Sequence, residues 1–468
     1  MPLLALLLYS SLVLYLLRYD RRQSTRVSGA MWVPTIWMLS AASRAFGAWF
    51  GGGGIANVDS GSLLDQICVS GLLCLGLLIL ANRKLDWRSV RKQNTWLILL
   101  LAYLLTSVLW SDIPFISLKR WVREELTAVI MALVVLTDPA PRQAMESLFR
   151  RQVYICIPFS ILLIKYFPQY GVQYDRWFGQ EMWSGVTQQK NDLGRLCVIS
   201  AFFLIWTLIR RWKGKELYRH KGQTLAEVVL LLLSLWLLKG PSDYAGSATG
   251  FVALSIGSAA FAGLLWLKKH RMSLPPNLLM AITGMIMALG IVTLFSQGSS
   301  VAGFTSLVGR NSTLTGRTDV WAQLVPIMER HPVFGGGFGG FWTSATEAEL
   351  LYNEAHNGYL EVLLQGGIVG LLITSMFLLS FGRSAAQALA YDYDWASLCI
   401  CFLLMAAFHN FSESSFDSFN KHLMAVILFL AVTLPAVAKR AQTKPSVARQ
   451  TPGVNRARSL SGLPQYRG

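Results

Sequence analysis

The chain has 468 residues, of which 53% are apolar and only 14% are charged. Soluble domains usually carry about 25% charged residues, and apolar runs of membrane-spanning length recur along this sequence, so the composition excludes an ordinary soluble protein. The net charge of +17 is also typical of nucleic-acid-binding proteins, but the basic residues here lie in loops between apolar runs. Because lipid cannot satisfy open backbone groups, the expected fold class is all-α, a polytopic transmembrane bundle.

The apolar pattern predicts thirteen spans, although the first is short and the eighth and ninth lie close together, so twelve to thirteen are expected. The first run has no basic residue before it and no small-residue cleavage site after it, which favours a retained span over a signal peptide. The predicted spans cover residues 3–17, 29–49, 62–81, 95–111, 121–137, 152–167, 192–209, 224–239, 246–267, 277–296, 358–381, 395–411 and 422–438.

The distribution of basic residues predicts the orientation of the bundle. With the N-terminus outside, the loops that fall inside carry 29 of the 42 lysines and arginines. The positive-inside rule therefore predicts an N-terminus outside and a C-terminus inside, in the cytoplasm; the resemblance described below implies that the membrane is a bacterial inner membrane and that the outer side is the periplasm. The last segment, residues 439–468, is basic and poor in large apolar residues, and we interpret it as a disordered cytoplasmic tail that contacts anionic lipid.

Four parts follow from this pattern: transmembrane segments at 1–296 and 358–438, a large periplasmic loop at 297–357, and the tail. Inside the loop, "DVWAQLVPIMER" has its apolar residues at helical spacing and predicts a short helix. Two poses remain open for that helix, one lying flat on the membrane surface with Trp321 facing lipid and one packed on the bundle.

The loop also contains "GGGFGGFW", which formally matches a dinucleotide-binding glycine pattern at Gly335, Gly337 and Gly340. No strand precedes it and no βαβ unit surrounds it, so that function is rejected. The remaining interpretation is a glycine-rich backbone that passes close to a neighbouring group. That group could be another helix or the substrate, and packing against a helix is favoured. The six cysteines all lie in apolar segments without zinc-type spacing, and no metal site is expected. The "YDYD" motif at residues 391–394 is interpreted as a solvated loop.

His356 is the first candidate for chemistry, because it lies where the large loop enters a predicted span. A lone histidine is more often structural than catalytic, but a neutral imidazole at headgroup depth can take a proton from a sugar hydroxyl. Asn357 offers a donor and an acceptor to sugar or phosphate, and Glu354 is placed to orient the ring.

Three further groups of charged residues lie at predicted external ends of spans. Arg317 precedes the short loop helix, and its planar fork suits a diphosphate, although a surface arginine on headgroups is the plainer interpretation. Lys190 and Arg195 could add positive charge, unless Asp192 simply pairs with Arg195 at the i,i+3 spacing. In "SLKRWVREEL", mutual pairing of the charges is expected.

Together, "GVTQQKNDLG", "GRTDVWAQLVPIMERHPVFGGGFGGFW" and "EAHNGYLEVLLQGGIVG" resemble the O-antigen ligase / Wzy polymerase superfamily, specifically over residues 183–381 and most closely its exopolysaccharide-polymerase branch. The resemblance implies a GT-C-like, metal-independent glycosyltransferase without cofactors, which takes a glycan from undecaprenyl diphosphate at the periplasmic face. By this resemblance, His356 activates the acceptor and Arg317 binds the diphosphate. Lys190 and Asn191 match the family motif contained in "GVTQQKNDLG".

One departure concerns a second family arginine, whose place falls in "GSATG" at Ala248. The second phosphate-binding cation must then come from Lys190, Arg195 or Lys239, or be missing.

The favoured function is an exopolysaccharide or O-antigen polymerase, because the "QQKN" stretch leans toward that branch. The alternative is a ligase that joins O-antigen to lipid A-core. A polysaccharide-lipid flippase or transporter, the alternative of another class, would predict internal repeats and helices broken at mid-bilayer, and no such repeat is seen in the sequence. A non-catalytic assembly subunit is the third hypothesis. Expected partners are the lipid-linked glycan, an acceptor glycan or lipid A-core, membrane lipids and polysaccharide export proteins, but no nucleic acid.

Overall fold

The computed structural model describes residues 2–50, 62–174, 179–214, 220–242, 246–295, 317–350 and 352–443. Within these ranges the protein is helical apart from one antiparallel hairpin of β1 (Val172–Tyr174) and β2 (Glu181–Trp183). The helices are α1 (Pro2–Gln23), η1 (Gly29–Met31), α2 (Trp32–Ala41), α3 (Phe46–Trp49), α4 (Leu63–Ala81), α5 (Trp87–Gln93), α6 (Thr95–Ser107), η2 (Val108–Trp110), α7 (Pro114–Trp121), the π-helix η3 (Val122–Leu126), α8 (Thr127–Leu136), α9 (Pro141–Tyr166), α10 (Pro168–Gly171), α11 (Lys190–Lys213), α12 (Lys221–Lys239), α13 (Ala248–Lys269), α14 (Pro276–Phe295), α16 (Arg317–Met328), α17 (Ser344–Leu350), α18 (Gly358–Ala388), α19 (Tyr393–His409) and α20 (His422–Thr443).

The expected fold class, an all-α polytopic membrane protein, is confirmed. Each of the thirteen predicted spans falls on helix, but only eight helices in the described ranges are long and apolar enough to cross a membrane, or nine if the bent pair formed by α5 and the helix after it is one span. The segment predicted at 29–49 is divided between α2 and α3. Two others, α19 and the apolar part of α20, are shorter than the full spans. The prediction of twelve to thirteen spans therefore includes several helices that are too short to be assigned to the membrane by length and composition alone.

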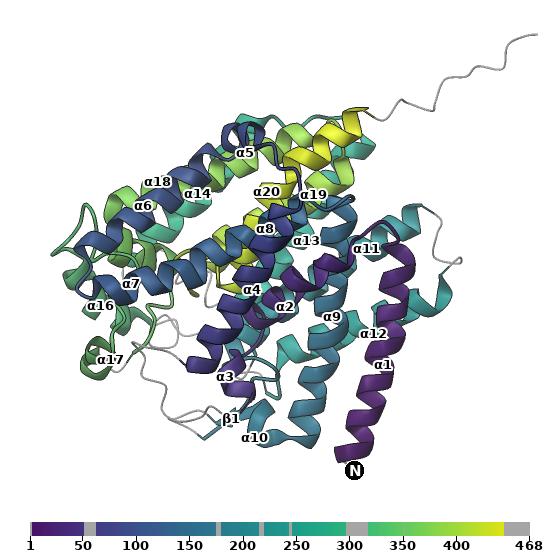
Figure 1. Cartoon of the computed structure of the whole chain (residues 1–468), viewed down its shortest axis with the longest axis horizontal. Coiled ribbons are helices and arrows are strands. Elements are labelled where there is room, and N and C mark those ends of the chain that lie inside the picture. The colour runs from purple at the N-terminus through teal and green to yellow at the C-terminus, as the bar shows by residue number, and fades with distance from the viewer. Residues whose placement is uncertain are drawn as a thin grey trace, which may run out of the picture.

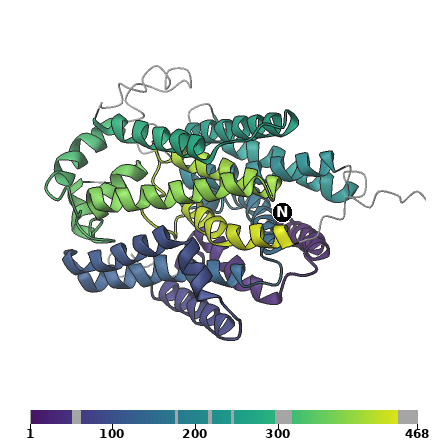
Figure 2. The same cartoon turned by 90° about the horizontal axis from the view of Figure 1, so that it is seen from above.

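The two ends of the bundle carry the segments that the charge pattern assigns to opposite sides of the membrane. The start of α1 lies at the same end as α10 and β1, whereas α5 and the far end of α20 lie at the opposite end (Figure 1). This arrangement agrees with the predicted grouping of loops, and which end faces the periplasm remains a prediction. Helix α18 lies between α14 and α6 (Figure 2).

The orientation itself has a direct test at two exposed positions. In a chain whose own cysteines are replaced by serine, a cysteine at Glu329 is expected to react with a membrane-impermeant maleimide in cells with a permeabilised outer membrane. A cysteine at Arg88, in α5, is expected to stay unlabelled until the inner membrane is opened. The reverse pattern would contradict both the topology and a periplasmic site.

Helix α9 begins eleven residues earlier than the span predicted at 152–167, and it takes two basic residues of a predicted cytoplasmic loop into the protein interior. Arg150 and Arg151 are both buried and lie 2.9 and 2.8 Å from the carboxylate oxygens of Asp20 in α1. These charges lower the local hydropathy, so the hydropathy pattern does not show where the helix begins. The pairing with Asp20 offsets the cost of burying the two arginines.

Helix α18 is broken at Gly367, whose φ of 60° and ψ of −162° are open only to glycine among common residues. The glycine segment (residues 332–340) lies against this break and supplies hydrogen bonds that the helix lacks. The amides of Gly336 and Gly337 donate to the carbonyls of Leu364 and Gln365 at 2.8 and 2.9 Å. The segment is therefore a backbone packing element, which is the favoured sequence interpretation.

Replacing Gly367 by alanine is expected to destabilise the protein by roughly 1–3 kcal/mol from backbone strain alone. A Cβ at this position would also lie 2.4 Å from the carbonyl carbon and oxygen of Val333, and backbone cannot give way cheaply. Thermal unfolding of the purified protein in detergent measures the effect. Gly284→Ala in α14 is the matched control, because nothing lies within 4 Å of its Cβ; equal melting temperatures for both variants would contradict the account.

The loop helix predicted from "DVWAQLVPIMER" is present as α16, and it packs on the bundle rather than lying with Trp321 toward lipid. Trp321 is 1% exposed, and its indole N–H donates to the carbonyl of Ala355 at 2.9 Å. Val320 and Leu324 are buried on the same face. The first part of the predicted loop, up to residue 316, and most of the predicted tail lie outside the described residues.

Candidate functional site

His356 has a left-handed backbone, with φ 49°, at the point where the loop joins α18. A non-glycine residue adopts this conformation only where its surroundings hold it, and such residues concentrate at functional sites. The preceding residue is fixed on both sides: the Ala355 amide donates to Glu361 at 2.6 Å, and its carbonyl accepts from Trp321. The imidazole is thus presented by a backbone with little freedom.

Asn357, a predicted substrate contact, is the N-cap of α18 instead. Its side-chain oxygen accepts from the amides of Tyr359 and Leu360 at 2.9 and 3.1 Å, and its amide group donates to the carbonyl of Phe411 at 3.0 Å. The residue is completely buried. Its oxygen caps the helix, as expected of an asparagine N-cap, and its amide group binds the Phe411 carbonyl, so both polar groups of Asn357 are engaged within the protein in this structure.

Glu354 lies beside the imidazole, as the sequence predicted. One carboxylate oxygen is 2.9 Å from Nδ1 of His356, and the same oxygen accepts from the side chain of Gln189 at 3.2 Å. The other oxygen is 3.7 Å from Nζ of Lys421. Burial would raise the pKa of Glu354, but His356 and Lys421 lower it well below its ordinary value, so the carboxylate stays ionised.

The pKa of His356 is raised above its ordinary value, although burial alone would lower it. The opposing cause is the carboxylate of Glu354, with a smaller contribution from Glu413, while Arg317 acts in the lowering direction. A raised pKa favours the imidazolium. The ring is therefore mostly neutral only at a pH above the ordinary histidine pKa of about 6.5.

This pKa shift predicts the pH dependence of any reaction that needs a neutral His356. Activity is expected to rise with pH as the imidazolium loses its proton. In Glu354→Gln the stabilising carboxylate is gone, so the pKa falls and the acid side of the profile moves to lower pH. Rate measurements across pH for both proteins check this, with Glu329→Gln, an exposed glutamate in the same loop, as control. An unchanged profile in Glu354→Gln would exclude His356 as the titrating base.

Arg317 begins α16, and its guanidinium pairs with the carboxylate of Glu413. Glu413 is 1% exposed, so the pair lies against the protein interior and its charges are poorly screened by water. Glu413 also acts electrostatically on His356. Arg317 and His356, which are thirty-nine positions apart in the sequence, therefore belong to one cluster.

The earlier external motif reaches the same cluster through the start of α11. That helix begins at Lys190, next to Gln189, which contacts Glu354. Lys190 and Asn191 are half-buried at this helix start. Arg195 is buried and pairs with Asp192 at 3.1 Å, as its i,i+3 spacing predicted.

The sequence analysis missed the 410–421 loop, which connects α19 and α20 and contacts both Arg317 and Glu354. It supplies Glu413 to Arg317 and Lys421 to Glu354, and Lys421 also lies 3.3 Å from Asp417. Burial would lower the pKa of Lys421, but Asp417 and Glu354 raise it, so the ammonium stays charged. The available signal was the placing of Glu413, Asp417 and Lys421 at i,i+4 spacing between two predicted spans.

The N-termini of α13, α16 and α18 contact this loop, and Gln189, directly before α11, contacts Glu354. Besides the contacts above, Thr249 in the first turn of α13 hydrogen-bonds Ser412 at 2.6 Å, and the Gly358 amide of α18 donates to the Asn410 carbonyl at 3.0 Å. Helix N-termini carry partial positive charge and unpaired N–H groups, which favour anions. The start of α13 includes Ala248, the position where the family arginine was expected.

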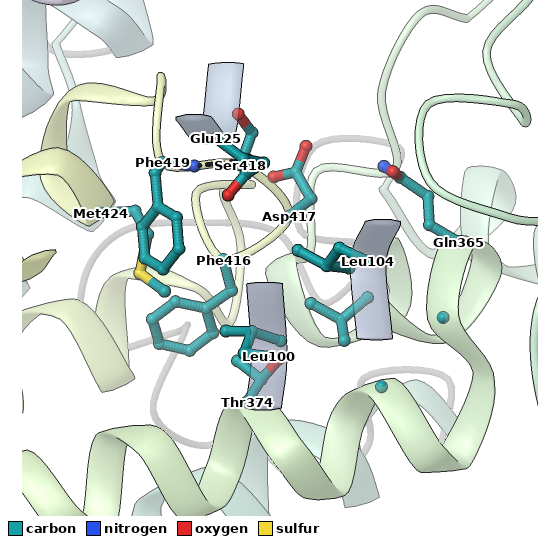
Figure 3. Close-up of a pocket in the computed structure, with 13 residues that line it drawn as sticks. Leu100, Leu104, Glu125, Gln365, Thr374, Phe416, Asp417, Ser418, Phe419 and Met424 are labelled. Carbon is teal, nitrogen blue, oxygen red and sulfur yellow. Dashed lines mark hydrogen bonds between the residues drawn. The ribbon is translucent and has the colours of Figure 1, made fainter. Parts of the chain in front are cut away.

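A narrow, partly open cavity adjoins the cluster where α18 is broken (Figure 3). Glu125, Ser418 and Asp417 line one side of it, and Leu100 and Thr374 line the other. Glu125, from η3, is completely buried and accepts from the Phe419 amide at 3.1 Å. Asp417, which lines the cavity, lies 3.3 Å from Lys421, and Lys421 lies 3.7 Å from Glu354.

The other charges of "SLKRWVREEL" pair as expected or support the glycine segment. Arg123 pairs with Glu124. Arg120 donates to the backbone carbonyls of Gly339 and Trp342, the latter at 3.0 Å. The lysine predicted as an alternative phosphate-binding cation, Lys239, ends α12.

Comparisons with known proteins give matches over this region. The O-antigen ligase family matches residues 244–375, which include Arg317 and His356. The chain is 24% identical over 320 residues to the exopolysaccharide production protein ExoQ of Rhizobium meliloti (strain 1021), an alignment that covers 65% of this chain and 68% of that protein. It is 30% identical over 162 residues to an O-antigen ligase of Pseudomonas aeruginosa, covering 33% of this chain and 35% of that protein.

Proposed function

We propose that the chain, whose residues 244–375 match the O-antigen ligase family, transfers a glycan from undecaprenyl diphosphate to a sugar hydroxyl at the periplasmic face of the inner membrane. One observation carries the proposal: a His356–Glu354 pair lies beside the partly buried Arg317 and the buried Arg195, next to a loop that the N-termini of α13, α16 and α18 contact. A base and an anion site side by side are what such a transfer requires.

In the proposed reaction, the acceptor hydroxyl attacks the anomeric carbon of the donor glycan. The new carbon–oxygen bond forms as the bond from that carbon to the diphosphate oxygen breaks, and the lipid diphosphate leaves with the electron pair. With Nδ1 of His356 turned to Glu354, Nε2 takes the hydroxyl proton. Glu354 orients the ring and stabilises the imidazolium that forms.

Charge on the leaving diphosphate is balanced by protein groups in this proposal. Arg317 provides a planar fork for two phosphate oxygens, and Arg195 and Lys190 lie at the start of α11 as further cations. In the absence of an arginine at position 248, the second phosphate-binding cation in this proposal is Arg195, which pairs with Asp192 through one terminal nitrogen and has no hydrogen-bond partner at Nε within the described ranges. Because arginines and helix N-termini neutralise the charge, no metal is needed, and activity is expected to survive EDTA.

Polymerisation of an exopolysaccharide or O-antigen repeat is the preferred form of the reaction. The relative matched over the larger share of both chains is an exopolysaccharide production protein. Ligation of O-antigen to lipid A-core is the second candidate, because the relative with the higher identity over a shorter region is an O-antigen ligase. The two reactions share a donor and differ in the acceptor.

Transport of a lipid-linked glycan is not favoured, although the break in α18 is a feature that transporters use at their binding sites. Here the freed backbone groups are occupied by the glycine segment. The Ile368 amide, for example, donates to the Pro332 carbonyl at 2.9 Å. The break therefore does not leave an open backbone site for a substrate.

The deciding experiment is incubation of the purified full chain in liposomes with lipid-linked repeat units alone, with and without EDTA. Longer lipid-linked chains in both samples support a metal-independent polymerase. Product that forms only after addition of lipid A-core supports a ligase. If properly folded protein gives neither product with either acceptor, glycan transfer by this chain is excluded.

A further inference from the structure

Glu354, His356 and Glu413 form a set of metal-ligating groups within the proposed active site. One ligand atom from each lies within 4.8 Å of the other two. A tetrahedral zinc site with metal–ligand distances near 2.1 Å keeps its ligands about 3.4 Å apart. Small side-chain rotations would therefore bring the three groups to coordination distance.

Glu413 gives this cluster a feature that its hydrogen bonds do not explain. Arg317 takes one carboxylate oxygen, whereas the other, Oε2, has no hydrogen-bond partner among the described residues, even though Glu413 is 1% exposed. A buried carboxylate oxygen without a partner is costly. The free oxygen can coordinate a cation without breaking the Arg317 pair.

The donor set selects the class of cation. One imidazole nitrogen with two carboxylates resembles the three-ligand sites that hold Zn²⁺ with a fourth position open. Mg²⁺ demands octahedral oxygen coordination and keeps several waters, which a partly buried, histidine-containing cluster suits poorly. The nearby cations lower the affinity of any metal, but Lys421 approaches Glu354 only to 3.7 Å and on its second oxygen.

We propose that Glu354, His356 and Glu413 bind one Zn²⁺ per chain and that this zinc reversibly inhibits glycan transfer. The metal occupies one ring nitrogen of His356 and leaves the ring proton on the other, so no basic nitrogen can accept the hydroxyl proton while zinc is bound. The inhibitory half of this inference rests on the proposed function, whereas the binding half does not.

Binding is measured by equilibrium dialysis of the EDTA-stripped, purified full chain against ZnCl₂. The expected result is one zinc per chain, with affinity reduced at least about tenfold in Glu413→Gln, since one of three ligands is lost, and with no competition from excess MgCl₂. Glu329→Gln, an exposed glutamate of the same loop, is expected to bind like the unmodified chain. Thermal unfolding confirms that both variants are folded.

Equal zinc affinity in Glu413→Gln and in the unmodified chain, or no binding at all, would overturn the site. The activity measurement is separate: zinc is expected to suppress transfer and EDTA to restore it. Zinc that binds at Glu413 without lowering transfer would overturn the inhibitory role. A preparation that binds zinc but never transfers glycan supports the metal site and contradicts only the proposed function.

Discussion

Replacement of His356 by asparagine is expected to lower the rate of glycan transfer by about 10²- to 10⁴-fold, the usual contribution of a general base, while donor binding stays close to that of the unmodified chain. Asparagine is chosen because it tolerates the left-handed backbone found at this position, with φ 49°. It is uncharged and has no basic nitrogen. The backbone that presents it is held by Glu361 and Trp321.

Two measurements separate a base from a structural residue at this position: product formed per unit time, and donor affinity of the purified protein. His331→Asn makes the same chemical change at an exposed position of the same loop and is expected to alter neither. Turnover in His356→Asn equal to that of the control would show that the imidazole has no part in proton transfer. Loss of donor affinity without loss of turnover at saturation would assign His356 to binding.

Arg317→Ala is expected to weaken donor binding by roughly tenfold to a hundredfold, because hydrogen bonds to charged groups contribute about 1.5–3 kcal/mol. Arg317→Lys is expected to recover only part of this, since a point charge cannot form the two-pronged contact. Arg330→Ala, at an exposed position near the end of α16, is the matched control.

The arginine change also leaves Glu413 buried without its partner, so stability must be separated from binding. In Arg317→Ala combined with Glu413→Gln, the uncompensated charge is removed and the melting temperature is expected to recover relative to Arg317→Ala alone. Donor affinity is expected to remain low in the double variant. Recovery of affinity together with stability would mean that Arg317 supports the fold and does not hold the diphosphate.

The sequence predicts the parts of this molecule that depend on local pattern. Hydropathy places the helices, and the polar run before α18 identifies His356 and Glu354, whose side chains meet in the structure. Arg317 lies in the same cluster, because its partner Glu413 acts on His356, while its role in binding diphosphate stays a prediction. Spacing alone predicted the Asp192–Arg195 pair.

What the sequence could not predict depends on contacts between distant segments. Asn357 was predicted to bind sugar although an asparagine before an apolar run is a local N-cap signal; only its contact with Phe411 depends on folding. The 410–421 loop looked like an ordinary connection, since only folding brings Lys421 to Glu354. The arginines at the start of α9 read as loop residues until Asp20, about 130 positions away, is seen to pair with them.

The pairing of the glycine segment with the broken part of α18 limits how this protein can be recombined with its relatives. Residues 332–340 supply hydrogen bonds to residues 364–369, and Gly335 and Gly367 approach so closely that a Cβ on either would meet the backbone of the other strip at 2.5 Å or less. A chimaera that exchanges the loop at the point where it enters α18 would separate these two strips. A segment exchanged between relatives should therefore include the glycine segment together with α18 to beyond its break at Gly367.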